Sequence, residues 1–375
     1  MRKLLPFFTV TTLFGILTAP AVLMLAGITL GHPLTENRPL AEFPDQCEEI
    51  TKCVDDARNW LNDNSPIRNL LIRTHTQIQY SVFGVSDKVH IGKDGWLFYR
   101  STMDVEKTNL ERHSEHSVEK FQADLLKLKL MLGAESIELI VLPLPLKDTI
   151  YPEMIPSTVP SLPAPSQYKK LVNWLKTSEI TTIDAAKTLT ELKLERSTFH
   201  RTDFHWNDPA AFRLATDLVN MLADDDQALR WKHLLEIEKK QYSGGQASFL
   251  PLLRTPSEQS IFLVDTWTAT STSNYKYGDS AGFWEYLFER NPETGGLGSL
   301  VVFGDSFFDG FHRSGFDLHF SEVRRARINT TSLADVLGNR PCNTKYFLFE
   351  TIESSLFGWI AAGLSLPDEL PPCVP

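Results

Sequence analysis

Three short runs of apolar residues constrain the fold of this chain more than any other feature. They span residues 137–142, 300–303 and 346–349, and the first is apolar except for Glu138. Uninterrupted apolar runs of this length are typical of strands buried on both faces, as in a parallel sheet covered by helices. Segments with the apolar spacing of helices separate them, so the sequence predicts an α/β fold with a largely parallel sheet.

The segments around these runs contain further periodicities and turn signals. Residues 45–80 have a helical spacing that Asn64-Ser65-Pro66 interrupts, and Asp94-Gly95 between two apolar runs is a hairpin signal. Pro143 is expected to end the first strand, because proline cannot continue a central strand. Further helices are predicted over residues 117–132, 168–177, 185–194 and 207–222, and further strands over residues 180–184 and 260–264.

The N-terminus carries a long uncharged stretch, residues 4–30, which follows two basic residues. A membrane-spanning helix needs about 20 mostly apolar residues, so this stretch is long enough for an anchor. The basic residues before it favour an orientation that places the remaining chain outside the cytoplasm. A cleaved signal peptide is the alternative, since residues 19–21 resemble a small-residue cleavage site.

Composition excludes some classes of protein. Hydrophobic residues make up 42% of the chain, which is enough for a core and excludes disorder throughout. The formal net charge of -10 disfavours a generally basic nucleic-acid binder. The four cysteines lack the spacing of a zinc site. If the domain lies in an oxidising compartment they allow three pairings, of which Cys47–Cys53 with Cys342–Cys373 is the most economical.

Ser306 is the first candidate for a catalytic side chain. It follows the apolar run 300–303 through Gly304 and Asp305, at a point where a helix is expected to begin. In open α/β sheets ligands bind beyond the carboxyl ends of the strands. The backbone N–H groups of Ser306 and its neighbours would face a developing oxyanion there. Helix capping by Ser306 or Asp305 is the structural alternative.

Asp203 and His205 form the second candidate site, within the motif over residues 201–206. In an extended segment, residues i and i+2 point to the same side. Asp203 could then accept a hydrogen bond from one imidazole nitrogen of His205 and leave the other nitrogen free as a base. A polar pair ahead of a helix is one alternative. A metal site that also uses His200 is another, although no further ligand cluster accompanies these residues.

Four motifs occur in order along the chain, and with residues 36–38 they carry a family resemblance. The motifs are Gly92-Lys93-Asp94-Gly95-Trp96-Leu97-Phe98, Pro143-x-Pro145-x-Lys147 with Tyr151-Pro152, Arg201-Thr202-Asp203-x-His205-Trp206, and Gly304-Asp305-Ser306-Phe307. This set resembles the SGNH-hydrolase-like family of alginate O-acetylation proteins. The resemblance extends over about residues 36–310, which is most of the chain after the uncharged stretch.

The resemblance implies an SGNH-hydrolase-like α/β/α sandwich and a periplasmic O-acetyltransferase held at the inner membrane. A signal anchor would occupy residues 1–33, a tether with N-terminal helices residues 34–85, and the catalytic domain residues 86–375. The expected partners are an exported polysaccharide and a multi-pass membrane acyltransferase that supplies acetyl groups. No cofactor, metal or nucleic acid is expected.

The resemblance also assigns roles within the candidate site. Ser306 would be the nucleophile that carries the acetyl group, His205 the base, and Asp203 the residue that orients the base. Ser306 and Gly304 would contribute to the oxyanion site. The resemblance identifies no second oxyanion donor; Asn274 is a weaker candidate, and a polar loop residue is the alternative interpretation of it. An acetylesterase that uses the same residues is one alternative function. A non-catalytic polysaccharide-binding scaffold is the other, although the presence of all three residue types argues against a decayed site.

Overall fold

The structure is a computed structural model. It describes residues 4–34, 38–45, 49–109, 115–159, 166–223, 235–265, 274–277, 283–289 and 296–375. The chain divides into two compact units, of which the first comprises Met1–Ser86 with Ser248–Thr255, and the second comprises Asp87–Ala247 with Pro256–Pro375. All the candidate site residues belong to the second unit. The three-part division predicted at residues 33 and 85 stays a prediction.

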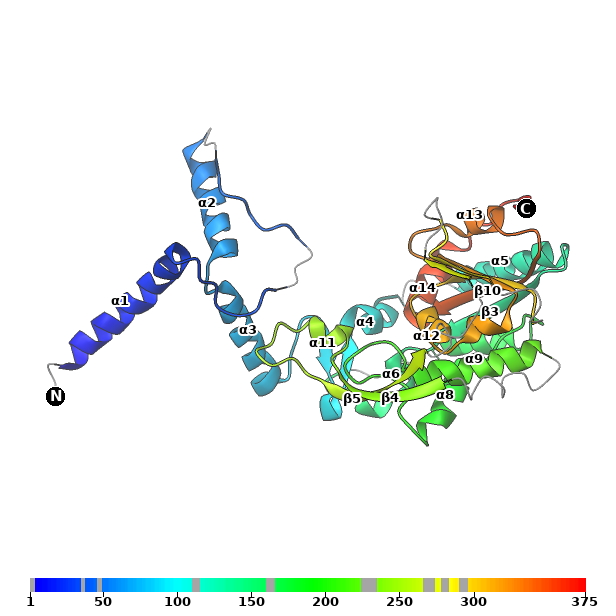
Figure 1. Cartoon of the computed structure of the whole chain (residues 1–375), viewed down its shortest axis with the longest axis horizontal. Helices are drawn as coiled ribbons and strands as arrows, with labels where there is room; N and C mark the ends of the chain where they lie inside the picture. Colours follow the sequence, from blue (N-terminus) through cyan, green and yellow to red (C-terminus); the bar gives the residue numbers. More distant parts are fainter. Residues whose placement is uncertain are drawn as a thin grey trace. The chain divides into compact units, whose positions relative to one another are not determined.

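Helix α1 (Leu4–Leu25) covers most of the uncharged N-terminal stretch (Figure 1). It contains Pro20. Within the ranges that the structure describes, none of the helices has both the length and the hydropathy of a membrane span. The structure therefore gives no support to the anchor expected over residues 4–30.

The helical spacing over residues 45–80 corresponds to two helices, α2 (Ile50–Asn64) and α3 (Arg68–Ile78). The break between them lies at the predicted position. The guanidinium of Arg38 donates to both carboxylate oxygens of Asp63, at 2.7 and 2.6 Å. This pair joins the segment before α2 to the end of that helix.

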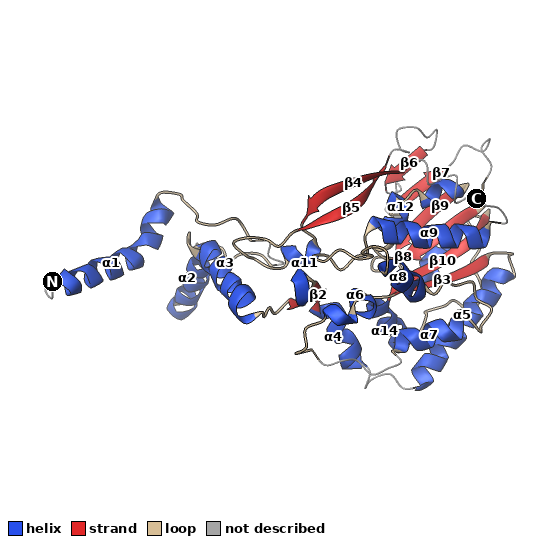
Figure 2. Ribbon diagram, turned by 90° about the horizontal axis from the view of Figure 1, so that it is seen from below, coloured by secondary structure: helices blue, strands red, loops and turns tan. Residues whose placement is uncertain are grey.

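A six-stranded sheet forms the centre of the second unit (Figure 2). Its strand order is β3 (Glu138–Leu144), β10 (Thr344–Ile352), β8 (Ser299–Gly304), β9 (Glu322–Arg327), β7 (Tyr286–Glu289) and β6 (Asn274–Tyr277). The first four strands are parallel, whereas β7 and β6 are antiparallel to their neighbours. The sheet is therefore mixed, which corrects the largely parallel sheet predicted from sequence. The chain between β6 and β7 is too short for the crossover that parallel pairing requires.

Helices cover both faces of this sheet, as Figure 2 shows. One face packs against α6 (Lys147–Ile150), α8 (Ala185–Lys193), α9 (Asp208–Leu222) and α12 (Phe308–Arg313). The other packs against α5 (Glu115–Gly133), α7 (Gln167–Leu175), α13 (Leu333–Gly338) and α14 (Glu353–Ala362). Alternate residues of each central strand point into opposite layers, which explains why the strand sequences are apolar throughout.

Two details of the predicted strands are wrong. Strand β3 continues through Pro143, which is in register with Thr351 of β10. Because β3 lies at an edge of the sheet, the missing N–H of Pro143 is tolerated there. Residues 180–184 form no strand: only Thr181 makes a bridge, to Ile140, and Asp184 instead caps α8 by accepting from the Lys187 N–H.

Other local predictions are confirmed. Asn207 caps α9 by accepting from the Ala210 N–H at 3.1 Å, and Pro209 lies in the first turn. The hairpin at Asp94-Gly95 joins β1 (Val89–Ile91) to β2 (Leu97–Tyr99). A second hairpin pairs β4 (Leu235–Tyr242) with β5 (Glu258–Asp265), the latter covering the strand predicted over residues 260–264.

The cysteine prediction is confirmed in one half. Cys342 and Cys373 form a disulfide that closes a sequence separation of 31 residues near the C-terminus. Cys47 lies outside the described residues, so the Cys47–Cys53 pairing stays a prediction.

Candidate active site

Ser306 lies in the turn that follows β8, at the carboxyl end of a central strand. The backbone passes from Gly304, the last residue of β8, through Asp305 and Ser306 before α12 begins at Phe308. A Cβ atom on Gly304 would lie 2.6 Å from the Glu350 Oε2 atom of the adjacent strand β10. A side chain at this position would therefore displace the buried Glu350 carboxyl group, which favours glycine here.

Asp305 holds this turn in shape from within the core. One carboxylate oxygen accepts the Phe307 N–H at 2.9 Å and the other accepts the Ile352 N–H at 3.0 Å. The Asp305 N–H donates to Glu350 Oε2 at 2.8 Å. Burial raises the pKa of Asp305, although the hydrogen bonds from Phe307 and Ile352 oppose the shift. Burial, together with repulsion from Asp305, raises the pKa of Glu350 well above its ordinary value.

These contacts change the predicted source of oxyanion donors. The N–H groups of Phe307 and Phe308 donate to Asp305, so they do not point freely toward a ligand. Among the residues that the structure describes, the Ser306 N–H donates no hydrogen bond. Gly304 lies within the end of β8, paired with Arg327. The expectation that neighbouring N–H groups assist Ser306 is therefore wrong for Phe307 and Phe308.

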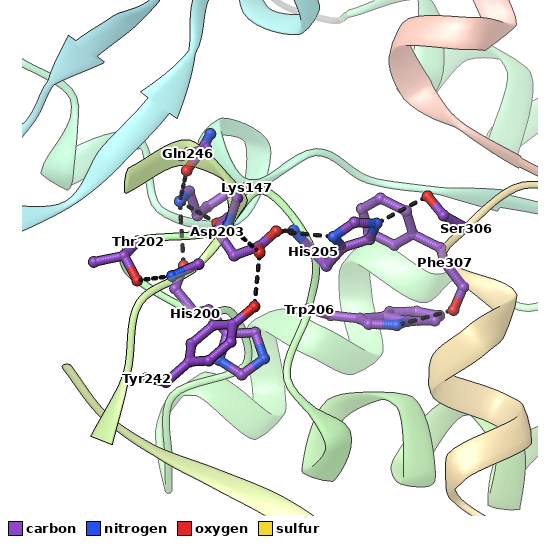
Figure 3. A network of polar contacts seen from close by, with 12 residues as sticks. Lys147, His200, Thr202, Asp203, His205, Trp206, Tyr242, Gln246, Ser306 and Phe307 are labelled. Atoms are coloured by element: carbon purple, nitrogen blue, oxygen red, sulfur yellow. Dashed lines mark hydrogen bonds and ion pairs between the residues drawn. The ribbon is translucent and has the colours of Figure 1, made fainter. Parts of the chain in front are cut away.

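His205 connects Ser306 to Asp203 in one chain of hydrogen bonds (Figure 3). Its Nε2 atom lies 2.8 Å from Ser306 Oγ, and its Nδ1 atom lies 2.8 Å from Asp203 Oδ1. The two segments are 101 residues apart in sequence. The His205 side chain is 28% exposed and that of Asp203 is 7% exposed, so the imidazole is accessible while its carboxylate partner is buried.

The backbone around Asp203 differs from the extended segment assumed in the sequence analysis. Residues 201–205 form a succession of bends. The Asp203 carboxylate also accepts the His205 backbone N–H at 3.1 Å. A side chain that binds the N–H two residues later closes a local turn, and this turn brings the imidazole next to the carboxylate.

The second carboxylate oxygen of Asp203 is held by residues to which the sequence assigned no role. The Tyr242 hydroxyl donates to Asp203 Oδ2 at 2.7 Å (Figure 3). The Gly245 N–H donates to the same oxygen, also at 2.7 Å. A Cβ atom on Gly244 would lie 2.5 Å from Asp203 Cβ, so only glycine fits against it. The pair Gly244-Gly245, which follows the end of β4 after one residue, was the available sequence signal.

The donors around Asp203 keep it ionised. Burial alone would raise the pKa of the Asp203 carboxyl, but the hydrogen bond and the charge of His205 outweigh that effect. The N–H groups of Gly245 and His205 add to the stabilisation, and the pKa lies well below its usual range. Burial, together with the neighbouring Asp203 charge, raises the pKa of Tyr242, which therefore stays a hydrogen-bond donor.

Aromatic rings surround the imidazole. The Phe204 ring lies 3.9 Å from the His205 ring between centroids, and the Phe307 ring lies 5.0 Å from it. The Trp206 indole N–H donates to the Phe307 carbonyl oxygen at 3.2 Å. The motif residue Trp206 therefore ties the segment that carries His205 to the segment that carries Ser306.

The structure does not bring every predicted residue to this site. Asn274 begins the edge strand β6, in register with Glu289, and its side chain lies outside the described part of the molecule. His200 directs its Nδ1 atom to Ser260 Oγ at 2.6 Å rather than toward His205, which removes the arrangement suggested for a metal. No group of three or more His, Cys, Asp or Glu side chains in the described ranges could hold a metal ion.

Comparison with known families assigns the chain to one of them. The family model described as "SGNH hydrolase-like domain, acetyltransferase AlgX" matches residues 89–292, which is more than half of the chain. The chain belongs to this family. The match includes Asp203 and His205 and ends before Ser306.

Curated relatives agree with this assignment. The "Probable alginate O-acetylase AlgJ" of Pseudomonas aeruginosa is 26% identical over 198 residues, which cover 50% of this chain and 47% of the relative. The protein of the same name from Pseudomonas fluorescens is 25% identical over 196 residues, or 51% of this chain and 48% of the relative. The chain thus matches about half the length of each curated relative.

Two solved structures are similar to this chain. PatB1 of Bacillus cereus with a sulfonyl adduct gives a TM-score of 0.50 at 13% identity, over 67% of this chain and 93% of that one. The O-acetyltransferase domain of Pseudomonas putida AlgJ gives a TM-score of 0.47 at 16% identity, over 73% of this chain and 97% of that one. At 13% identity the PatB1 likeness bears on the fold alone, and it agrees with the SGNH-like arrangement described above.

Proposed function

We propose that this chain transfers acetyl groups to hydroxyls of an exported polysaccharide through an acetyl-Ser306 intermediate. The observation that carries the proposal is the hydrogen-bonded chain from Ser306 Oγ through the His205 imidazole to the Asp203 carboxylate. Such a chain turns a weakly nucleophilic hydroxyl into an attacking group. Membership of an acetyltransferase family supports acetyl as the group that is transferred.

The first half-reaction forms the acetyl-enzyme. Ser306 Oγ attacks the carbonyl carbon of an acetyl ester donor while its proton passes to His205 Nε2. The ionised Asp203 keeps a hydrogen on Nδ1, so that Nε2 is the nitrogen that can accept. The tetrahedral oxyanion is stabilised by the Ser306 N–H. It collapses when the donor oxygen leaves with the proton held by His205.

The second half-reaction returns the enzyme to its starting state. A sugar hydroxyl gives its proton to His205 Nε2 and attacks the carbonyl carbon of acetyl-Ser306. The new tetrahedral centre collapses, Ser306 Oγ leaves, and it recovers the proton from His205. Water in place of the sugar hydroxyl would release acetate, so transfer requires that the acceptor displace water from the imidazole. The Phe204 and Phe307 rings around His205 favour such exclusion.

The cellular setting is part of the same proposal. We place the domain in the periplasm at the inner membrane, beside a multi-pass membrane acyltransferase that supplies acetyl groups. The Cys342–Cys373 disulfide supports an oxidising compartment. The matched relatives named as alginate O-acetylases support an anionic polysaccharide acceptor. Alginate oligosaccharide is therefore the first acceptor to test.

The test uses the purified chain with 4-nitrophenyl acetate as donor and alginate oligosaccharide as acceptor. Mass spectrometry is expected to find an acetyl group on Ser306 and on the oligosaccharide. Ser306→Ala should lose both products. Ser178→Ala is the control, because the Ser178 hydroxyl bonds to backbone groups beside the end of α7, where it donates to the Leu175 carbonyl and accepts the Ile180 N–H. Acetate release without acetylated sugar would identify an acetylesterase, and activity retained in Ser306→Ala would refute the acetyl-Ser306 intermediate.

A further inference from the structure

Lys147 is a buried charged residue for which the proposed reaction has no use. Lys147 is the first residue of α6 and is 3% exposed. The Nζ atom lies 5.6 Å from the Trp96 ring centre and 5.4 Å from that of Phe98. Burying an ammonium costs several kcal/mol unless hydrogen bonds and opposite charges compensate. The compensating groups around Lys147 therefore indicate what it holds in place.

Those groups belong mainly to the segment that carries the candidate base. The Lys147 ammonium lies 3.2 Å from the carbonyl oxygen of His200, 3.2 Å from that of Arg201 and 2.6 Å from that of Asp203. A fourth oxygen, Gln246 Oε1, accepts at 2.7 Å (Figure 3). Three backbone carbonyls within four residues can converge on one cation only if the chain bends around it.

The opposite side of the same bend is held by a negative charge. Glu258 of β5 accepts the N–H groups of Arg201 and Thr202 at 2.9 and 2.8 Å, and also the Thr202 hydroxyl at 2.8 Å. Glu258 is 6% exposed. The carbonyls of the bend thus face an ammonium while its N–H groups face a carboxylate, and both charged groups are fixed to neighbouring secondary structure.

From this arrangement we infer that Lys147 is a positioning residue of the proposed reaction. Its ammonium fixes the bend at residues 200–203 and thereby sets the Asp203 carboxylate and the His205 imidazole toward Ser306. The inference rests on the proposed triad and adds to it a residue that never touches the substrate. It also gives a physical role to the lysine of the Pro143-x-Pro145-x-Lys147 motif.

The charge on Lys147 depends on pH in an accessible range. Burial lowers the pKa of Lys147 to about 7, and the charges of Asp203, Glu258 and Asp148 oppose the shift only in part. The ammonium is therefore present below that pH and is lost as pH rises through it. A neutral amine donates two hydrogen bonds instead of three, so the bend loses part of its support on the alkaline side. Ser306 reactivity should fall there.

The experiment measures covalent labelling of Ser306 by phenylmethylsulfonyl fluoride as a function of pH, in the full chain. Ser306 Oγ attacks sulfur, fluoride leaves, and the hydroxyl proton passes to His205. Lys147→Met keeps the packing against Trp96 and Phe98 but removes the ammonium. Labelling should slow by about 10- to 100-fold, as expected for a displaced catalytic group. The alkaline fall near pH 7 should also disappear.

Lys193→Met is the matched control. Lys193 also donates to a backbone carbonyl, that of Ile150 at 2.6 Å, and lies 4.5 Å from the Tyr151 ring centre, but it does not contact the bend. It should label at the wild-type rate. A folded Lys147→Met variant with wild-type rate and pH profile would overturn the inference.

Gln246→Glu decides the question if Lys147→Met does not fold. The variant places a carboxylate 2.7 Å from the ammonium and keeps the shape of the side chain. An opposite charge this close favours the protonated form of Lys147. The pH at which the labelling rate falls on the alkaline side should therefore rise by about 1–3 units. If the labelling rate of this variant falls at the same pH as that of the wild-type chain, the role of Lys147 is overturned. Absence of Ser306 labelling in the wild-type chain would instead refute the triad itself, so the two failures are distinguishable.

Discussion

Replacement of Asp203 by asparagine tests the candidate triad most directly. Four donors surround the carboxylate: His205 Nδ1 and the His205 N–H on one oxygen, at 2.8 and 3.1 Å, and the Tyr242 hydroxyl and the Gly245 N–H on the other, at 2.7 Å each. Asparagine offers one oxygen and one NH₂ group. Two of the four donors must therefore face the NH₂ group, which cannot accept their hydrogen bonds. The longer contacts on the His205 side make that side the less costly place for the NH₂ group.

This orientation predicts the size of two effects. The NH₂ group would favour the imidazole tautomer with hydrogen on Nε2, which cannot accept the Ser306 proton, and a wrong tautomer costs about 10⁴-fold in rate. That loss corresponds to about 5 kcal/mol of transition-state stabilisation. The His205 backbone N–H would also be left without an acceptor, which lowers the free energy of unfolding by about 1–3 kcal/mol.

The assay compares 4-nitrophenyl acetate turnover and urea unfolding of Asp203→Asn with those of the wild-type chain. Asp217→Asn is the control, because Asp217 pairs with Arg213 on the surface of α9 and has no contact with the triad. It should keep full activity. Activity of Asp203→Asn within about tenfold of wild type, a difference of only about 1.4 kcal/mol, would refute the assignment of Asp203 as the residue that fixes the imidazole tautomer.

Three further substitutions follow from contacts around the site and in the fold. Gly304→Ala places a Cβ atom 2.6 Å from Glu350 Oε2, so it should lower the free energy of unfolding by about 1–3 kcal/mol in urea titrations. Tyr242→Phe removes a hydrogen bond to a charged carboxylate and should cost about 1.5–3 kcal/mol in the same titrations. Breaking the Cys342–Cys373 disulfide with Cys342→Ser, which opens a sequence separation of 31, should cost about 3–4 kcal/mol, seen as a lower Tm. An unchanged stability in any of them would contradict the corresponding contact.

The fold was predictable where a single physical signal dominates. The apolar runs over residues 300–303 and 346–349 are explained by strands that are buried on both faces. In the structure these runs lie in β8 and β10. The antiparallel edge was not predictable, because strand direction depends on how β7 pairs with β9 and not on its own sequence. Pro143 shows the same limit: whether proline is tolerated depends on its place at the sheet edge.

The candidate site was predictable for the side chains that would do chemistry and not for those that hold them. Serine after a buried strand and an Asp-x-His pair are recognisable from residue type and spacing. The supports of Asp203 come from Tyr242 and Gly245, about 40 residues away, and only folding brings them together. The reason given for the Asp203–His205 contact was also wrong, because a side-chain turn, rather than strand alternation, makes it.

The two segments of the site are supported in the same physical way. The His205 segment is held between the Lys147 ammonium and the Glu258 carboxylate, and the Ser306 turn is held between the Arg325 guanidinium and the Glu350 carboxyl group. Arg325, which is 1% exposed, donates to the Asp305 carbonyl oxygen. From the other side, Glu350 accepts the Asp305 N–H.

Both supports act on backbone groups and leave the imidazole and the hydroxyl free to react. Each pairs a positive charge with carbonyl oxygens and a carboxyl group with N–H groups, so the charges cannot turn toward water without breaking the bend that they hold. Catalysis by oriented groups is efficient when their orientation is set before the substrate arrives, since no reorganisation is then needed during the reaction. Burial of these four charged or acidic side chains costs stability in the fold. The compensating gain lies in the fixed 2.8 Å contact between His205 Nε2 and Ser306 Oγ, which two separate and flexible segments would not maintain.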